Sequence, residues 1–246
     1  MICFCASPTN LTDQFALLVF KNFTRDTNNV LTNNWTISTS FCNWIGVTCS
    51  PRRQRVTALI LPELNLQGTI SQSITNLSFL AVLNLGNNFF QGILPSGLGL
   101  LPRLRVVDVH NNQLEGSVPL SLFRNQKLQT ISLAYNQFSG GLLGQPWNLP
   151  QFRILNLTSM LLLYLGCVEN SIGGDIPWEL GNLFNLKMLG FDFNNLVGEI
   201  PQAIFNISSL IYIAFTANRL SGHIPETTGL QLPNLEGIFL ADNQLT

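Results

Sequence analysis

Hydrophobic residues recur along this chain with a period of 24. The clearest unit reads L-x-x-L-x-L-x-x-N, with Leu80, Leu83, Leu85 and Asn88 at its fixed positions. A glycine marks the period at Gly68, Gly92, Gly116 and Gly140, and again at Gly174, Gly198 and Gly222. A fixed period of this length is typical of repeat proteins in which each unit stacks on the next.

Each unit predicts two elements. The alternating L-x-L core predicts a short strand with one face inward, and the glycine permits a turn conformation that strains other residues. The second half reads P-x-x-L-x-x-L-x-x-L, a spacing that favours a short 3₁₀ or helical return segment. One unit cannot bury its leucine face alone, so the units stack into a parallel sheet with a continuous core. We therefore predict an α/β repeat solenoid, an elongated arc of about eight repeats over residues 56–246.

One asparagine per unit stands four residues before the glycine. Its amide both donates and accepts hydrogen bonds, so a buried asparagine satisfies loop backbone that would otherwise be unpaired. This structural ladder comprises Asn88, Asn112, Asn136, Asn170, Asn194, Asn218 and Asn243, and the first repeat has Leu64 at the same position.

The period breaks once. Gly140 and Gly174 lie 34 residues apart, ten more than the period. Removing residues 154–163 restores the unit and places Leu165 and Cys167 at the inward strand positions, which makes Cys167 an inert core thiol. Three interpretations of these ten residues stay open: an extra partial strand, a loop, or an error in the gene model.

Charge is scarce in this chain. Only 10% of the residues are charged and the formal net charge is −1, against about 25% charged residues in an average soluble domain. No run of like charges occurs, so we expect no basic stripe and no nucleic-acid partner. No apolar stretch reaches the roughly 18 residues of a membrane helix, so we expect no membrane span in this chain.

Catalytic motifs are absent from the sequence. There is no GxxxxGK[ST], HExxH or GxSxG, and the two histidines, His110 and His223, have no patterned acidic or cysteine partner. FDFNN at 191–195 is similar to a kinase DFG, but it is the strand and asparagine of a repeat, with Phe191 inward. We expect neither an enzyme nor a cofactor nor a metal.

The outward positions of the strands predict a binding surface on the concave face. Aromatic residues on a polar surface are frequent binding anchors, and a protein or peptide is the expected ligand. The candidate residues are Asp108, His110, Tyr135, Asp192, Phe193, Tyr212 and Phe239.

Several features predict the secretory pathway. Residues 1–11 resemble the end of a signal peptide followed by the mature N-terminus, although a basic start is missing. Six N-x-S/T sequons occur, at Asn10, Asn22, Asn34, Asn76, Asn156 and Asn206, as in secreted glycoproteins. A glycan on Asn156 would block part of the concave face. Cys42 and Cys49 are too far apart for a CxxC motif, and an oxidising compartment would allow them to oxidise.

The LxxLxLxxNxLxGxIP pattern over residues 12–246 resembles plant-specific leucine-rich repeat proteins. TDQFALLVFK, followed by NNWTISTSFCNWIGVTCSPRRQRVTAL, resembles the N-terminal cap of plant receptor-like kinases, most closely the group that contains immune receptors for bacterial patterns. The resemblance implies a cap over residues 12–55 with a Cys42–Cys49 disulfide and with Trp44 packed on the first repeat. A capping helix would start at Thr12 and Asp13. Its expected buried face comprises Phe15, Leu18 and Val19.

The same resemblance implies a function. The chain is expected to be the extracellular recognition module of a receptor-like kinase at the apoplastic face of the plasma membrane, where it binds a peptide or microbial pattern and recruits a co-receptor ectodomain. One alternative is a secreted inhibitor or decoy similar to polygalacturonase inhibitors, whose C-terminal cysteine cap is missing here. Another is a product without a stable fold. Because the last unit stops at Thr246, inside a repeat, we expect the chain to be truncated at both ends.

Overall fold

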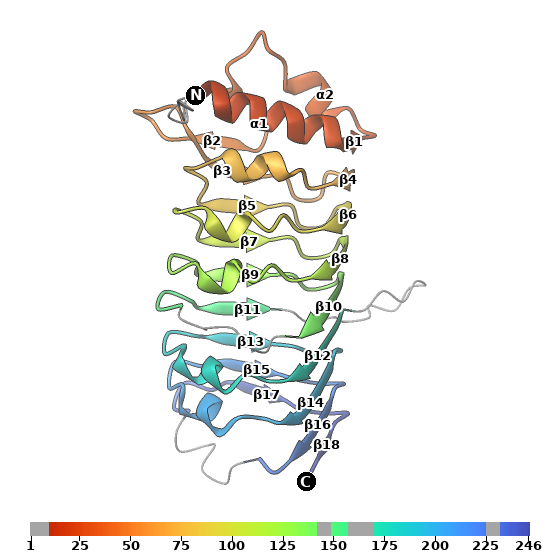
Figure 1. Ribbon diagram of the computed structural model, residues 1–246, viewed down its shortest axis with the longest axis vertical. Coiled ribbons are helices and arrows are strands. Elements are labelled where there is room, and N and C mark those ends of the chain that lie inside the picture. Colours follow the sequence, from red (N-terminus) through yellow and green to blue (C-terminus); the bar gives the residue numbers. More distant parts are fainter. Residues whose placement is uncertain (1–9, 142–148, 157–169, 225–231) are drawn as a thin grey trace, which may run out of the picture.

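The computed structural model describes residues 10–141, 149–156, 170–224 and 232–246. These residues form an elongated stack of repeats with a helical cap at the N-terminal end (Figure 1). Each repeat contributes one strand to each of two sheets that run along the stack. The architecture is the predicted leucine-rich repeat arc, with a parallel sheet on its concave face. The second sheet was not predicted from the sequence.

The concave sheet has nine strands. In chain order they are β2 (Val47–Cys49), β3 (Val56–Ile60), β5 (Val82–Asn84), β7 (Val106–Asp108), β9 (Thr130–Ser132), β11 (Ile154–Asn156), β13 (Met188–Gly190), β15 (Tyr212–Ala214) and β17 (Gly237–Phe239). From β3 to β17 all neighbours pair in parallel and in register, as in Leu83↔Val107 and Leu189↔Ile213. A side chain at a given strand position therefore lies beside its equivalents in the repeats above and below.

The second sheet follows the ladder asparagines. Its strands are β1 (Thr24–Asp26), β4 (Leu66–Thr69), β6 (Phe89–Ile93), β8 (Gln113–Ser117), β10 (Gln137–Gly141), β12 (Ser171–Asp175), β14 (Asn195–Glu199), β16 (Arg219–Gly222) and β18 (Gln244–Leu245). The repeated glycine lies within these strands; Gly92, for example, has a φ of 76°, a conformation that favours glycine.

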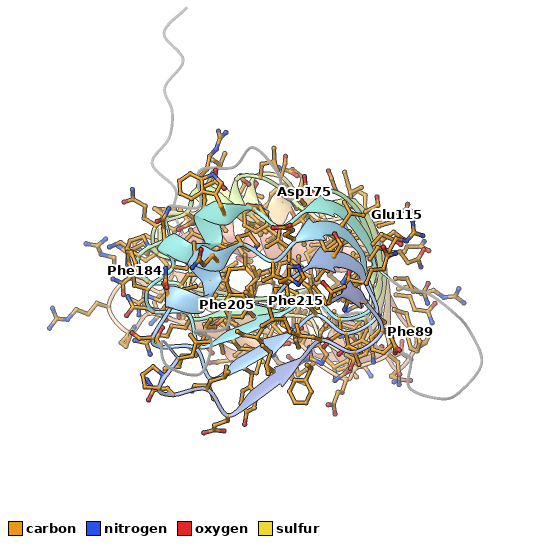
Figure 2. All side chains as sticks on the ribbon, turned by 90° about the horizontal axis from the view of Figure 1, so that it is seen from below. Phe89, Glu115, Asp175, Phe184, Phe205 and Phe215 are labelled. Carbon is orange, nitrogen blue, oxygen red and sulfur yellow. A yellow bond between two sulfur atoms is a disulfide. The ribbon has the colours of Figure 1, made fainter. Side chains whose placement is uncertain are left out.

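Short 3₁₀ helices return the chain to the next repeat, as the three-residue leucine spacing predicted. They are η2 (Gln72–Asn76), η3 (Leu98–Leu100), η4 (Leu122–Arg124), η5 (Trp178–Asn182) and η6 (Gln202–Asn206). One continuous hydrophobic core fills the space between the sheets and these helices. Phe205 and Phe215 lie inside it, whereas Phe89, Glu115 and Phe184 lie on the outside (Figure 2). Phe191 is fully buried, as expected, and stacks on Phe215.

The ladder asparagines join each repeat to the one before it. Asn136 is fully buried, and its Nδ2 donates to the carbonyls of Val109, Leu133 and Ala134 at 2.9–3.2 Å. Its Oδ1 accepts from the N–H of Leu114 at 3.0 Å. The same acceptor contact is made by Asn88, Asn112, Asn170, Asn194, Asn218 and Asn243. Loop backbone that no sheet can pair is thus satisfied from the side chains.

The cap covers the first edge of both sheets. It contains α1 (Asn10–Phe23), α2 (Val30–Asn34) and η1 (Phe41–Asn43). Its strand β1 pairs antiparallel with β4, and β2 pairs antiparallel with β3. Strand edges that would otherwise be open to other chains are therefore closed. The Cys42–Cys49 disulfide is present and ties η1 to β2, and Trp44 is buried and stacks on Trp35.

Part of the cap prediction was wrong. Helix α1 begins at Asn10, before Thr12, and Phe15 is 66% exposed, although it was expected on the buried face. Leu18 and Val19 are half-buried. The buried side comprises Asp13, Ala16, Leu17 and Phe20, because α1 packs on η2, where the hydroxyl of Ser73 donates to the carbonyl of Ala16.

The interrupted repeat also differs from the expectation. Its strand is β11, inside the ten residues whose removal restored the period, and Leu155 occupies the inward position. β11 pairs in register with β9 and β13. The additional length therefore falls between this strand and the ladder residue Asn170. Leu165 and Cys167 lie outside the described residues, as does most of the segment 1–11.

None of the helices in the described ranges is long and apolar enough to cross a membrane.

Candidate ligand-binding site

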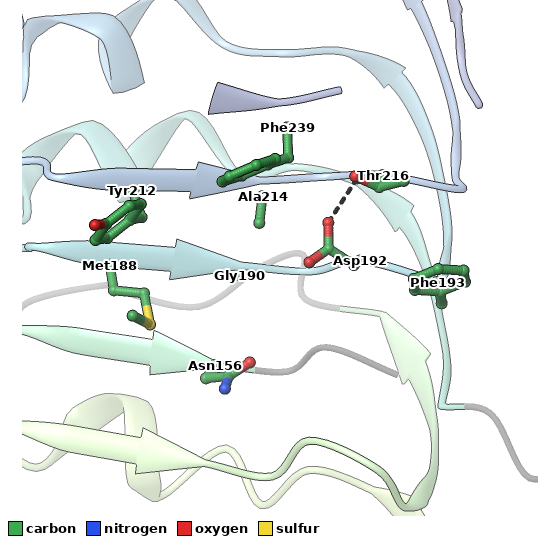
Figure 3. A pocket seen from close by; sticks show the side chains of 9 residues that line it. All are labelled: Asn156, Met188, Gly190, Asp192, Phe193, Tyr212, Ala214, Thr216 and Phe239. Atoms are coloured by element: carbon green, nitrogen blue, oxygen red, sulfur yellow. Dashed lines mark hydrogen bonds between the residues drawn. The ribbon is translucent and has the colours of Figure 1, made fainter. Parts of the chain in front are cut away.

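A cleft of about 530 Å³ lies on the concave sheet, over the strands β11, β13, β15 and β17 (Figure 3). It is lined by Asn156, Met188, Gly190, Asp192, Phe193, Tyr212, Ala214, Thr216 and Phe239. The outward strand positions supply most of this lining. Because neighbouring strands are in register, residues from repeats that lie far apart in the sequence become adjacent.

Small side chains make the hollow. Gly190 and Ala214 occupy the third position of β13 and β15, where the repeats on either side carry Asn156 and Phe239. Met188, Tyr212 and Phe239 surround this low floor (Figure 3). Phe239 is 52% exposed, so an aromatic ring faces solvent at the rim. A mostly apolar hollow with a few placed polar groups is the usual form of a binding site.

Two hydrogen bonds orient the polar groups of the cleft. The carboxylate of Asp192 accepts from the backbone N–H of Thr216 at 2.7 Å, which links adjacent repeats (Figure 3). The hydroxyl of Tyr212 donates to Oε2 of Glu236 at 2.5 Å. This hydrogen bond, together with the negative charge of Glu236, raises the pKa of the Tyr212 phenol above its ordinary value. Tyr212 is therefore held as a neutral phenol.

The structure separates the predicted site residues into two groups. Asp192, Phe193, Tyr212 and Phe239 meet in the cleft. Asp108 and His110 lie nearer the cap and contact each other, with 2.6 Å between Asp108 Oδ1 and His110 Nδ1. Tyr135 follows β9 and does not line the cleft; like Phe193 it has a left-handed backbone, with a φ of 56°.

Sequence reasoning missed Met188, Gly190 and Ala214. They stand at the same strand positions as the chosen aromatic residues, so the repeat register would have found them. The selection favoured aromatic and charged side chains, whereas the hollow depends on small ones.

The sequon residues differ in exposure. Asn156 is half-buried in the cleft lining, while Asn10, Asn22, Asn76 and Asn206 are exposed and Asn34 is half-buried. A glycan on Asn156 would occupy the cleft. Glycosylation at all six positions stays a prediction.

The cleft has the features of a binding site. In the part of the chain that the structure describes, no group of three metal-binding side chains occurs. Asp192 and Tyr212 make hydrogen bonds that hold them in place, and an apolar floor lies between them. Such an arrangement can bury an apolar side chain and orient polar groups around it.

The expectation of no basic stripe was wrong for the folded chain. Exposed basic residues from successive repeats lie along the edge of the concave sheet where its strands begin; they are Arg103, Arg105, Lys127, Arg153 and Lys187. We call them the basic stripe. They are up to 34 residues apart in sequence, so no charge run signals them, and stacking of the repeats brings them together.

Comparisons with known proteins agree with the fold and the cap. Residues 10–50 match the family described as leucine rich repeat N-terminal domain, and residues 79–101 and 103–125 match the leucine rich repeat family. The chain is thus a leucine-rich repeat protein with the N-terminal cap of that class.

Its relatives are plant receptor-like kinases. The LRR receptor-like serine/threonine-protein kinase EFR of Arabidopsis thaliana is 48% identical over 92 residues, which cover 37% of this chain and 9% of EFR. The chain therefore matches less than a tenth of that relative, and the match falls in the leucine-rich repeat ectodomain, outside the kinase domain.

Solved structures extend the likeness over more of the chain. The plant peptide hormone receptor RGFR1, solved in complex with RGF2, superposes with a TM-score of 0.65 at 33% identity and covers 73% of this chain and 27% of the receptor. A plant ice-binding protein superposes with a TM-score of 0.79 at 26% identity, over 97% of this chain and 73% of that protein.

Proposed function

We propose that this chain is an extracellular ligand-recognition module of a plant leucine-rich repeat receptor-like kinase, and that the concave cleft binds a peptide ligand for defence or developmental signalling. The observation that carries the proposal is the hollow at Gly190 and Ala214, walled by Tyr212 and Phe239. A partly exposed aromatic ring beside an apolar hollow is a typical anchor for a ligand side chain.

The comparisons support this class of ligand. RGFR1 was solved with RGF2, and the ectodomain of GASSHO1/SCHENGEN3 from Arabidopsis thaliana, 28% identical to this chain, was solved with CASPARIAN STRIP INTEGRITY FACTOR 2. An extracellular location fits the Cys42–Cys49 disulfide, since disulfides persist in oxidising compartments. In this proposal a co-receptor ectodomain and a kinase domain belong to the signalling assembly, and this chain contributes recognition alone.

The other functions considered have less support. A secreted inhibitor or decoy similar to polygalacturonase inhibitors would use the same concave face, and no feature of the described residues favours it. Ice binding, suggested by one structural neighbour, is also not favoured: the outer face of the second sheet carries the acidic residues Glu115, Asp175 and Glu199 among its repeats.

Selection from a phage-displayed library of random 12-residue peptides tests the proposal. We expect wild-type protein to enrich peptides that bind the Tyr212→Ala/Phe239→Ala variant at least about 30-fold more weakly, the loss expected for one hot-spot residue. Phe89→Ala/Phe184→Ala is the matched control, because it removes two exposed rings outside the cleft. Enriched peptides that bind the cleft variant as tightly as the wild type would sink the proposal.

A further inference from the structure

The basic stripe is built by the register of the repeats. Arg105, Arg153 and Lys187 each stand directly before a strand of the concave sheet, β7, β11 and β13. Their backbones occupy successive rungs: the N–H of Gln129 donates to the carbonyl of Arg105, Arg153 to Gln129, and Lys187 to Arg153, at 2.7–2.8 Å. Rungs are about 4.8 Å apart, so the three charges span about 14 Å.

The charges of the stripe are available to a partner. All five side chains are exposed, and the ion pairs found among the described residues, Asp13–Arg55 and Asp108–His110, involve none of them. The guanidinium of Arg103 lies 3.9 Å from the centre of the Phe79 ring, which holds it in place at the cap end of the stripe. In a chain with 12 basic residues, five gathered along one edge are a concentrated positive surface.

The stripe is continuous with the cleft. Lys187 directly precedes Met188, and Arg153 directly precedes the strand that ends at Asn156, so both charges border the cleft lining. Two rungs beyond Lys187 the same edge carries Glu236, joined through Ile211 by backbone hydrogen bonds. The edge therefore changes from positive to negative across the cleft.

We propose that the ligand of this face is an acidic peptide that lies along the stack. Its apolar side chain occupies the cleft, and its acidic residues extend from there toward the cap, over Lys187, Arg153 and Arg105. The 14 Å of the stripe correspond to about four residues of extended chain. A negative charge on the other side of the anchor would meet Glu236 and be disfavoured, which gives the peptide a direction. This inference rests on the proposed function and names the chemistry and orientation of its ligand.

Fluorescein-labelled peptides test it directly. The probes are EDEDGLF and its reverse order FLGDEDE, because chain polarity is not specified, and the charge-reversed KKKKGLF. We expect one acidic probe to bind wild-type protein at least about tenfold more tightly than the lysine probe. Binding should weaken between 0.05 and 0.5 M salt, because these exposed charges are screened over about 10 Å at 0.1 M.

Two matched variants locate the interaction. Arg153→Gln/Lys187→Gln should weaken the acidic probe about fivefold or more, as expected for two exposed charge contacts. Arg25→Gln/Arg219→Gln removes two exposed charges from the second sheet and should leave binding unchanged. Circular dichroism melting confirms that both variants are folded.

The outcomes separate this inference from the proposed function. If acidic and lysine probes bind equally and binding depends on Tyr212 and Phe239, the acidic-peptide inference is wrong and the cleft proposal stands. If polygalacturonate binds the stripe and the acidic probes do not, the stripe is a carbohydrate surface and the inference is again overturned. If neither probes nor library peptides bind the cleft, both proposals fall.

Discussion

Asp13 of helix α1 forms a buried ion pair with Arg55, 42 residues further along the chain. The carboxylate accepts from Nε and Nη2 of Arg55 at 2.9 and 2.7 Å and from the N–H of Val56 at 2.8 Å. Arg55 also donates to the hydroxyl of Ser78 and lies over the ring of Phe79. One side chain of the cap is thus joined to the first repeat through bonds that satisfy both charges.

Breaking this pair should strongly destabilise the protein. Asp13→Asn leaves the Arg55 charge buried without its partner, and we expect a loss of about 3 kcal/mol in the free energy of unfolding. Urea unfolding followed by circular dichroism measures it. Glu115→Gln on the exposed second sheet is the control and should change stability by less than about 0.5 kcal/mol. A loss below 1 kcal/mol for Asp13→Asn would show that the pair does not hold the cap.

The asparagine ladder gives a second stability prediction. Asn136→Ala leaves the N–H of Leu114 and three carbonyls without this partner. We expect a loss of about 2–3 kcal/mol, as for buried backbone groups left unsatisfied. Asn195→Ala, at an exposed position of β14, is the matched control. Equal unfolding midpoints in urea for the two variants would contradict the ladder's structural role.

The cap disulfide closes a short loop. In the chain-entropy description, a loop of this length is stabilised by about 2–3 kcal/mol, and the Cys42→Ser/Cys49→Ser variant should lose that amount. Intact mass before and after reduction first establishes the bond, which should shift the mass by two hydrogens. An unchanged unfolding midpoint in the double variant would show that the cap is held by packing alone.

How much of this could be predicted depended on the range of the interactions. The ladder asparagines and Phe191 were predicted correctly because their environment repeats every 24 residues. Asp13 could not be assigned to the core, because a buried carboxylate needs a partner and Arg55 is far away in sequence. The strand β11 was misplaced because ILN satisfies the strand pattern within the segment that restores the period when removed.

The functional surface was harder to predict for a related reason. Tyr212 and Phe239 were chosen as aromatic residues on outward strand positions, and they do line the cleft. The cleft itself depends on Gly190 and Ala214, whose importance is visible only beside their larger neighbours in adjacent repeats. The basic stripe has the same origin, since Arg153 and Lys187 become neighbours through stacking.

The contact between Tyr212 and Glu236 predicts a pH effect. Because Glu236 raises the pKa of Tyr212, Glu236→Gln should lower the pH at which this tyrosine ionises. The stabilisation from the contact is fully present below the ordinary tyrosine pKa of about 10 and is lost as pH rises through the higher folded-state pKa. The absorbance of tyrosinate near 295 nm, measured against Tyr212→Phe, follows the titration. An identical midpoint in wild type and Glu236→Gln would contradict the contact.

The central claim, that the cleft recognises a ligand, is tested most directly by peptide selection on the wild type followed by affinity measurements on two variants. The account predicts that Tyr212→Ala/Phe239→Ala weakens the enriched peptides at least about 30-fold, and that Phe89→Ala/Phe184→Ala leaves their affinity unchanged. Peptides that bind all three proteins equally well would contradict it.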